Sequence, residues 1–238
     1  MNADRFHFFN SVHLESDLQV GVTTKFFDQK MKKDVIGEQQ RLYDLLEAHF
    51  SSDPDFMTSL DPLALPVKKK LASELVDMMK CGLATGTGPM SSVAGLFAKK
   101  TGELLLAGYN PPELVIENGG DLWICNKEEL LAGIYAGSSP FSEKIALAIP
   151  PGTWGVCSSS GVFGHSYSRG KADVVTVVCR DATLADAWAT SLANMIGKSR
   201  DVDIALEKAG TIPEILSCIV VAGDKLGIRG DLDLRLLA

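Results

Sequence analysis

The sequence has no cysteine motif, no excess of positive charge and no long hydrophobic run. Its five cysteines are odd in number and far apart, and no C-x-x-C pair occurs. The spacing supports neither a zinc site nor a disulfide framework, so we expect reduced thiols and a cytoplasmic location. Cys157, in a serine-rich segment, is a candidate nucleophile, although most cysteines in strands are simply buried.

The sequence also shows no pattern typical of a membrane span or a targeting segment. No run approaches roughly 18 consecutive apolar residues, so we expect no membrane span. The opening MNADRFHFFNSVH lacks a basic segment followed by an apolar one, so we expect no signal peptide. A net charge of −7 argues against nucleic acid or anionic membranes as the main partner. Binding of an anionic small molecule is compatible with this net charge, because an acidic protein can still have a locally positive site.

The composition is that of a folded domain. Of the 238 residues, 46% are hydrophobic and 22% are charged, which is far from the composition of disordered chains. The N-terminal half predicts two strands within 5–24, a helix over 34–50 and another with apolar positions at 67–79. Between these helices lies a connector rich in proline and aspartate, at 53–66.

The rest of the chain alternates less regularly. A glycine-rich break precedes a helix over 91–107. Strands then follow, at 114–118, 122–126, 131–137, 144–150, 154–160 and 172–180. An alanine-rich helix, a short acidic helix near 201–210 and a closing hairpin complete the pattern. Because strands and helices do not alternate strictly, we predict an α+β fold with antiparallel sheets and packed helices. We expect one domain over 1–238, with two halves that would divide near residue 110.

The first segment with chemical potential is TGTGPMSS, residues 85–92. Gly88 frees the backbone, Pro89 suits a first helical position, and Ser91 and Ser92 fall in the first turn. A helix start with free N–H groups and small side chains can bind an anion. The same residues would also serve a tight helix–helix turn.

The second segment is ENGGDLW, residues 117–123. Gly119 and Gly120 between two strands predict a hairpin turn with positive φ, which Asn118 and Asp121 tolerate and cap. The functional alternative is that the two glycines let a planar or phosphorylated ligand touch the backbone.

The third segment is CSSSGVFGHSYSRGKAD, residues 157–173. Hydroxyls of Ser158–Ser160 can donate to phosphate oxygens, and Arg169 or Lys171 can neutralise them. His165 is the histidine placed among such groups, as a general base or a residue that orients a leaving phosphate. The alternative is a glycine- and serine-rich loop with solvated cations.

The fourth segment is LADAWATSLAN, residues 184–194. Asp186 and Thr190 are four residues apart, so they share one helical face. Carboxylate, hydroxyl and carbonyl oxygens are ligands that Mg²⁺ or Ca²⁺ prefers. The surrounding alanines leave room for a strand or a ligand, but an ordinary packing helix would have the same composition.

Taken together, GPMSSVAG, ENGGD, SSSG…GHS and LADAWAT, in this order, resemble the ApbE-like superfamily, whose best-known members are FAD:protein FMN transferases. The match is closest to a short, functionally uncharacterised branch, and it includes ESDLQVGV and PDFMTSLDPL. The order of the four motifs is more specific than any one of them. The resemblance implies an α+β fold of antiparallel sheets, with the ligand between two halves.

The resemblance also implies a cofactor site. It makes Asp186, Thr190 and the Ala94 carbonyl the ligands of an Mg²⁺ that bridges a FAD diphosphate, with Ca²⁺ as an alternative cation. It places the flavin nucleotide next to the turn of residues 118–121. The glycine-rich helix start with Gly88, Ser91 and Ser92, and the Ser159, Ser160, Gly161 stretch with Arg169, would hold the phosphates.

The chain departs from the transferases where transfer occurs. It has SSSG for their T-S-G, and His165 matches only in position because the D-P of the H-I-x-D-P segment is missing. The lipoprotein signal and the acidic-serine segment of the long members are missing too. Binding of a flavin nucleotide is thus better supported than its transfer.

Three hypotheses follow. The first is an Mg²⁺-dependent flavin-nucleotide protein, with transfer or cleavage at the diphosphate as its chemistry. The second is a non-catalytic protein that stores or senses a nucleotide. The third is an enzyme on an unrelated small substrate. Exposed edge strands in such folds also suggest a homodimer.

Overall fold

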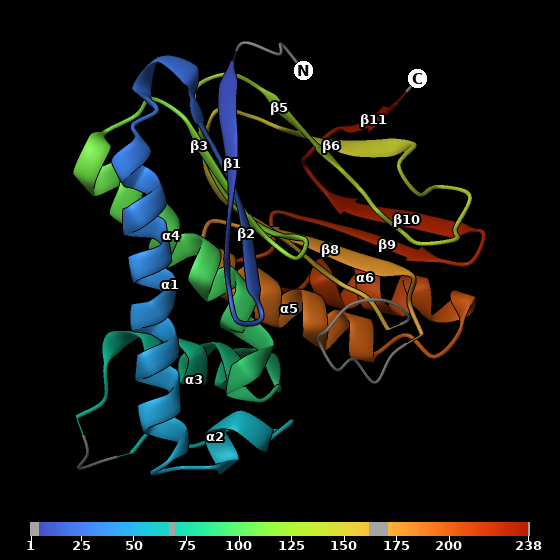
Figure 1. Ribbon diagram of the computed structural model, residues 1–238. Coiled ribbons are helices and arrows are strands. Elements are labelled where there is room, and N and C mark those ends of the chain that lie inside the picture. The colour runs from blue at the N-terminus through green and yellow to red at the C-terminus, as the bar shows by residue number, and fades with distance from the viewer. Residues whose placement is uncertain (1–4, 67–69, 162–170, 238) are drawn as a thin grey trace.

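A computed structural model describes residues 5–66, 70–161 and 171–237 (Figure 1). Strands of these residues form two antiparallel sheets. The larger sheet has eight strands in the order β1-β2-β3-β4-β7-β8-β9-β10, and the smaller has three in the order β11-β6-β5. The fold is therefore α+β with antiparallel sheets, as the sequence predicts.

The N-terminal elements follow the predicted pattern with shifted ends. Strands β1 (Phe6–His13) and β2 (Ser16–Thr23) form a hairpin. Helix α1 (Gln29–Phe50) begins earlier than residue 34, because the Asp28 carboxylate accepts a hydrogen bond from the Lys30 N–H at 2.9 Å and caps the first turn.

The next helices differ more from prediction. The connector contains a short helix, α2 (Asp55–Thr58), and α3 spans Ser73–Thr85. Leu71, predicted as a helical apolar position, precedes α3, and Val67 lies outside the described residues. A 3₁₀ turn at Pro89–Ser92 leads into α4 (Val93–Tyr109). Among the described helices, none is both long and apolar enough to span a membrane.

The remaining strands complete both sheets. The last predicted strand, 226–237, is divided by Gly230, whose φ is 121°, into one strand in each sheet. The larger sheet gains β3 (Leu114–Asn118), β4 (Asp121–Asn126), β7 (Gly152–Ser159), β8 (Val174–Cys179), β9 (Ser217–Ala222) and β10 (Lys225–Gly230). The smaller sheet consists of β5 (Leu130–Gly133), β6 (Ile145–Ile149) and β11 (Leu234–Leu236).

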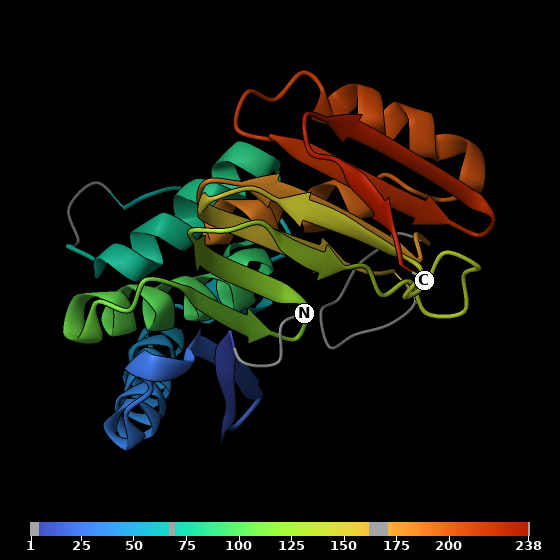
Figure 2. The ribbon, with the colours of Figure 1, turned by 90° about the horizontal axis from the view of Figure 1, so that it is seen from above.

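Helices cover one face of the large sheet, and the small sheet covers part of the other (Figure 2). Side chains alternate between these faces along each strand. Val175 and Val177 pack toward α1, α4, α5 (Ala182–Asn194) and α6 (Val202–Ala209), whereas Val174 and Val178 pack toward the small sheet. This alternation places the site residues described below on two opposite faces.

The alanines of α5 have a packing role. Ala185, Ala187, Ala189 and Ala193 are completely buried. A Cβ at Gly155 of β7 would overlap the backbone of α5 at Ala182. Small residues on both sides thus let the helix axis lie very close to the sheet, which is the packing alternative that the sequence left open.

Candidate functional site

One transverse row of polar residues crosses the helix-covered face of the large sheet. Asn118 on β3 pairs in register with Asp121 on β4. The register of β4 with β7 pairs Leu122 with Val156, so the next position toward the turn brings Cys157 beside Asp121. Asn118, Asp121 and Cys157 are all buried. A single row thereby gathers an amide, a carboxylate and a thiol beneath the helices.

The turn between β3 and β4 fixes this row. Gly119 and Gly120 have φ values of 63° and 104°, as the hairpin interpretation predicts. The Asp121 carboxylate accepts a hydrogen bond from the Ser158 backbone N–H at 3.1 Å. The turn thus holds Asp121 against β7, with Gly119 exposed and Gly120 partly exposed.

Helices α4 and α5 supply the opposing groups. The Asp186 carboxylate accepts a hydrogen bond from the Gly95 N–H at 2.8 Å, and the Ala94 carbonyl accepts one from the Asn118 amide at 3.3 Å. A Cβ at Gly95 would overlap the Ala182 carbonyl, so only glycine permits this approach of α4 to α5. We name the group formed by Asn118, Asp121, Asp186, Thr190 and the Ala94 carbonyl the acidic centre.

The two carboxylates of the acidic centre share a desolvated environment. Asp186 is 6% exposed and Asp121 is 5% exposed. Burial raises the pKa of Asp186 to about 7. Burial, and then the negative charge of Asp186, also raise the pKa of Asp121. Two carboxylates buried close to each other repel and are poorly solvated, and a bound cation would offset both costs.

Hydroxyl groups lie on both sides of the carboxylates. Thr190, one helical turn after Asp186, is buried. The Ser159 hydroxyl on β7 is buried and lacks a partner within the described part of the chain. By alternation Ser159 shares the helix-covered face with Cys157. These oxygens have capacity to bind a ligand or a cation.

The neighbouring serines have other partners. The Ser158 hydroxyl lies on the opposite face and is 2.8 Å from that of Thr176. Ser160 lines the cavity described below, and the Gly161 N–H donates to the Ala172 carbonyl at 3.0 Å. The predicted phosphate stretch therefore begins beside the acidic centre and ends at the cavity.

The predicted anion site at the start of α4 is closely packed. The Ser91 hydroxyl donates to the Gly88 carbonyl at 2.8 Å, and the Ser92 hydroxyl donates to the Pro89 carbonyl at 2.9 Å. A Cβ at Gly88 would overlap the Ser59 carbonyl of the connector. These contacts account for the segment as a tight turn, and its role in phosphate binding stays a prediction.

Two predicted residues cannot be placed. His165 and Arg169 lie outside the described residues.

Cys157 is completely buried, its thiol donates to the Ala182 carbonyl at 3.3 Å, and burial raises the pKa of that thiol. A protonated, enclosed thiol is a poor nucleophile, so the packing interpretation of Cys157 holds.

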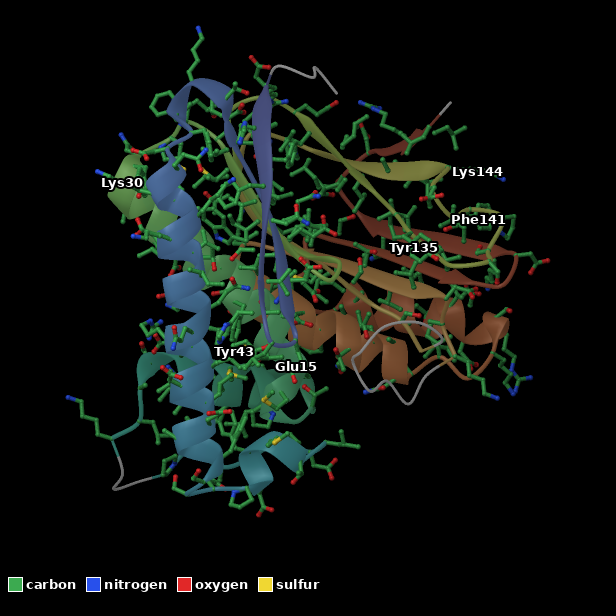
Figure 3. The ribbon with its side chains drawn as sticks, in the orientation of Figure 1. Glu15, Lys30, Tyr43, Tyr135, Phe141 and Lys144 are labelled. Carbon is green, nitrogen blue, oxygen red and sulfur yellow. The ribbon has the colours of Figure 1, made fainter. Side chains whose placement is uncertain are left out.

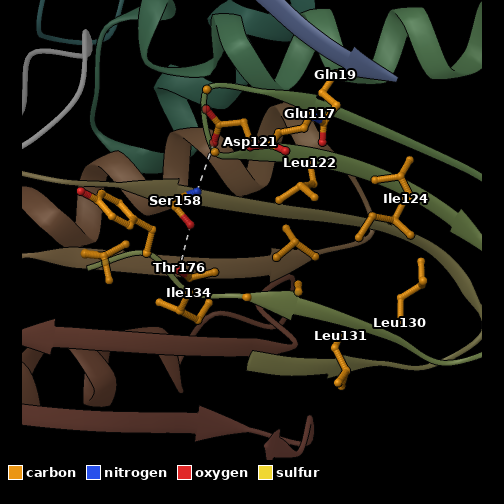
Figure 4. Close-up of a pocket in the computed structure, with 18 of the residues that line it drawn as sticks. Gln19, Glu117, Asp121, Leu122, Ile124, Leu130, Leu131, Ile134, Ser158 and Thr176 are labelled. Carbon is orange, nitrogen blue, oxygen red and sulfur yellow. Dashed lines mark hydrogen bonds between the residues drawn. The ribbon is translucent and has the colours of Figure 1, made fainter. Parts of the chain in front are cut away.

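A cavity of about 500 Å³ lies between the two sheets (Figure 4). Apolar side chains dominate its walls, including Leu122 and Val156 from the large sheet and Ile134 beyond β5. Gly119, Gly120 and Asp121 line the end nearest the acidic centre. We name this space the inter-sheet cavity. Tyr135 stands at its exposed rim, on the side of the molecule away from α1 (Figure 3).

Sequence reasoning missed several polar groups of this cavity, among them the carboxylate of Glu117. Glu117 alternates with Ile116 and Asn118 along β3, so a strand period of two already places it on the opposite face from Asn118. The signal existed in the sequence, but it required knowing that both faces carry a site.

Comparisons with known proteins decide the relationship. The family model described as "AbpE bacteria" matches residues 1–214. The chain belongs to the AbpE bacteria family. A "UPF0280 protein" of Methanocaldococcus jannaschii is 33% identical over 225 residues, covering 91% of this chain and 87% of that protein. The AbpE-family assignment thus confirms the expected ApbE-like superfamily.

Solved structures support the same fold. The ApbE protein of Thermotoga maritima has a TM-score of 0.62 at 13% identity, covering 95% of this AbpE-family chain and 97% of its own. The apo form of the flavinyl transferase ApbE of Pseudomonas stutzeri has a TM-score of 0.55 at 12% identity, covering 96% of both chains. At such identities the likeness shows the fold alone.

Proposed function

We propose that this AbpE-family protein binds a flavin dinucleotide such as FAD together with Mg²⁺. The observation that carries the proposal is the pair of buried carboxylates, Asp121 and Asp186, near the buried Thr190 and a Ser159 hydroxyl that lacks a described partner. Buried negative charges need a partner of opposite charge, and a cation would supply it. The flavin part of the proposal draws on the flavinyl transferase among the solved structures that share the fold.

The donor set fits a hard cation. Asp186, Thr190 and the Ala94 carbonyl offer carboxylate, hydroxyl and carbonyl oxygens from two neighbouring helices, and Asp121 faces them from the sheet. These are oxygen ligands of the kind that Mg²⁺ takes, with waters and phosphate completing the shell, and Ca²⁺ would accept the same set. A bound Mg²⁺ there would neutralise charge on phosphate oxygens.

The chain's own groups would position the nucleotide. The apolar walls of the inter-sheet cavity would cover the faces of a planar ring, and its volume lies within the range of small-molecule sites. The glycine turn at 119–120 would bring backbone close to the diphosphate between cavity and acidic centre. Ser159 and Ser160 would donate to the phosphate oxygens.

Calorimetric titration of FAD into the protein, with Mg²⁺ and then with chelator, tests the proposal. We expect binding that chelator abolishes and that Asp186→Asn removes. Asparagine keeps an oxygen acceptor for the Gly95 N–H, so the helix start should survive the change. Asp224→Asn, which removes an exposed carboxylate from the β9–β10 turn, is the matched control and should bind as the wild type does. Unchanged FAD binding in chelator would refute the metal-dependent site.

Turnover is a separate question, since the residue proposed for proton transfer is His165. A His165→Ala variant should keep FAD affinity within about twofold and lose any hydrolysis or transfer at the diphosphate. A wild type that binds FAD and yields no product with candidate acceptors would favour the storage or sensing alternative. A wild type without FAD affinity would favour an unrelated small substrate.

Location and assembly complete the proposal. All five cysteines are unpaired, which supports a reducing compartment such as the cytoplasm. Strand β1 is an edge of the large sheet, carries no charged residue and exposes Phe8 and Val12, features that favour a homodimer through this edge. Sedimentation of the wild type beside Val12→Lys tests this, with a dimer and a monomer expected.

A further inference from the structure

The polar end of the inter-sheet cavity is asymmetric. Glu117 on β3 pairs in register with Gln19 on β2 and with Leu122 on β4. All three line the cavity, with Glu117 half-buried and Gln19 exposed at the rim (Figure 4). Apolar wall, carboxylate and amide therefore follow one another across three neighbouring strands, from the interior to the solvent.

Within the part of the chain that the structure describes, no residue donates a hydrogen bond to the Glu117 carboxylate. The buried carboxylates of Asp121 and Asp186, in contrast, each accept one from a backbone N–H group. Burial, and then the negative charge of Asp17, raise the pKa of Glu117. A half-buried acceptor that faces a cavity and has no protein donor is available to an N–H group of a bound ligand.

We propose that Glu117 selects the ligand of the inter-sheet cavity by accepting a hydrogen bond from an N–H group on the edge of a planar nitrogen heterocycle. The geometry that carries this is the place of the Glu117 carboxylate beside the apolar walls, which would cover the faces of a bound ring and leave one edge free to meet β3. Gln19, next to it, carries both an amide donor and a carbonyl acceptor for the neighbouring atom of the same edge.

This inference rests on the proposed function and deepens it. A site built to hydrogen-bond a ring N–H rejects an analogue that lacks the N–H, because the carboxylate would then be buried without a partner. FAD offers such N–H groups on both ring systems, the flavin imide and the adenine amine. Asp186, Thr190 and the Ala94 carbonyl lie on the helix-covered face and do not line the cavity, so their contacts can be tested independently of those of Glu117.

The test measures FAD affinity in the presence of Mg²⁺ for the wild type, Glu117→Ala and Glu117→Gln. We expect Glu117→Ala to bind about tenfold more weakly or worse, the gap typical of a lost charged hydrogen bond. Glu117→Gln, which keeps a carbonyl acceptor of the same shape, should lose less. Asp17→Asn removes an exposed charge on the adjacent strand, outside the cavity lining, and should stay within about twofold of the wild type.

Methylated analogues identify the ring. The probes are FAD methylated at the flavin imide nitrogen and FAD dimethylated at the adenine amine. The wild type should lose about tenfold in affinity for one of them, and Glu117→Ala should bind that analogue and FAD equally. Thermal unfolding of each variant shows that it is folded.

The outcomes separate this inference from the proposed function. Equal FAD binding by the wild type and Glu117→Ala, or equal binding of FAD and both analogues by the wild type, would overturn the role of Glu117 alone. No FAD binding by the folded wild type would overturn the proposed function and this inference together.

Discussion

At the residue scale, a substitution of Ser159 should affect ligand binding and stability in different ways. Its hydroxyl is buried without a described partner on the face of the acidic centre. Because an unpaired buried hydroxyl is unfavourable, Ser159→Ala should leave the free energy of unfolding unchanged or raise it by about 1 kcal/mol. The same change should weaken Mg²⁺-dependent FAD binding about tenfold, since a phosphate donor is lost. Urea denaturation and calorimetry measure the two effects.

Ser158 provides the control one residue away. Its hydroxyl is paired with that of Thr176 on the cavity face, so Ser158→Ala should lower stability by about 1 kcal/mol because Thr176 loses its partner. If Ser159→Ala destabilises the protein and leaves FAD affinity intact, Ser159 has a structural role.

The sequence predicts which residues share a face where those residues are close together along the chain. Asp186 and Thr190 are four apart on a helix, so their shared face follows from helical geometry. The meeting of Asp186 with Asp121 and Gly95 depends on the packing of α4 and α5 onto the sheet, which no local spacing encodes. Only the resemblance to a family joined these segments in advance.

At the element scale, α4 depends on a glycine for its contact with the sheet. A Cβ at Gly102 would overlap the ring of Trp123, which is 4% exposed and enclosed in the core. Gly102→Ala should therefore lower the free energy of unfolding by about 1–3 kcal/mol through overpacking, despite the better helix propensity of alanine. Equilibrium urea unfolding measures the change.

Gly108 is the matched control on the same helix. A Cβ there would meet nothing within 4 Å, and the residue is exposed. Gly108→Ala should raise stability by about 0.5–1 kcal/mol, the usual gain of alanine over glycine in a helix. Equal effects of the two substitutions would show that Trp123 moves aside freely.

Sequence periodicity located the elements and misplaced some of their ends. The helix start at Gln29 depends on a side-chain cap from Asp28, which apolar spacing does not register. The segment 226–237 alternates like one strand, but Gly230 turns its end onto another sheet. The assignment of strands to two sheets is a tertiary choice, because both sheets use the same alternating pattern.

At the scale of the whole molecule, the large sheet carries different chemistry on its two faces. Adjacent positions of β3, Glu117 and Asn118, face the inter-sheet cavity and the acidic centre respectively. The glycine turn after them lies where the faces meet. A ligand with a planar ring and a phosphate group could therefore use both faces only by passing this turn. That geometry is the reason to expect a dinucleotide rather than a free base.

At the same scale, an ion pair between Arg5 and Glu113 connects the residue before β1 to the segment that joins β4 of the large sheet to β5 of the small sheet. Arg5 donates to the Glu113 carboxylate at 2.6 and 2.9 Å, and to the Glu128 and Glu129 carbonyls between β4 and β5. The Glu113 carboxylate also accepts from the Lys127 N–H at 2.8 Å. The Arg5 hydrogen bonds lower the pKa of Glu113 from 4.5 to about 2.

The sign of this shift sets the pH dependence of stability. A carboxyl whose pKa is lower in the folded protein stabilises it above the unfolded pKa, and the contribution is lost as pH falls from 4.5 toward 2. Glu113→Gln should therefore lower the free energy of unfolding by about 1–3 kcal/mol at neutral pH. The difference in free energy of unfolding between this variant and the wild type should decrease as the pH falls from 4.5 toward 2, as measured by urea unfolding across a pH series. Glu129→Gln, an exposed acid 3.9 Å from Arg235, should change stability little at any pH. If the difference in free energy of unfolding between the wild type and Glu113→Gln stays constant down to the lowest pH measured, packing around this side chain, and not its charge, stabilises the protein here.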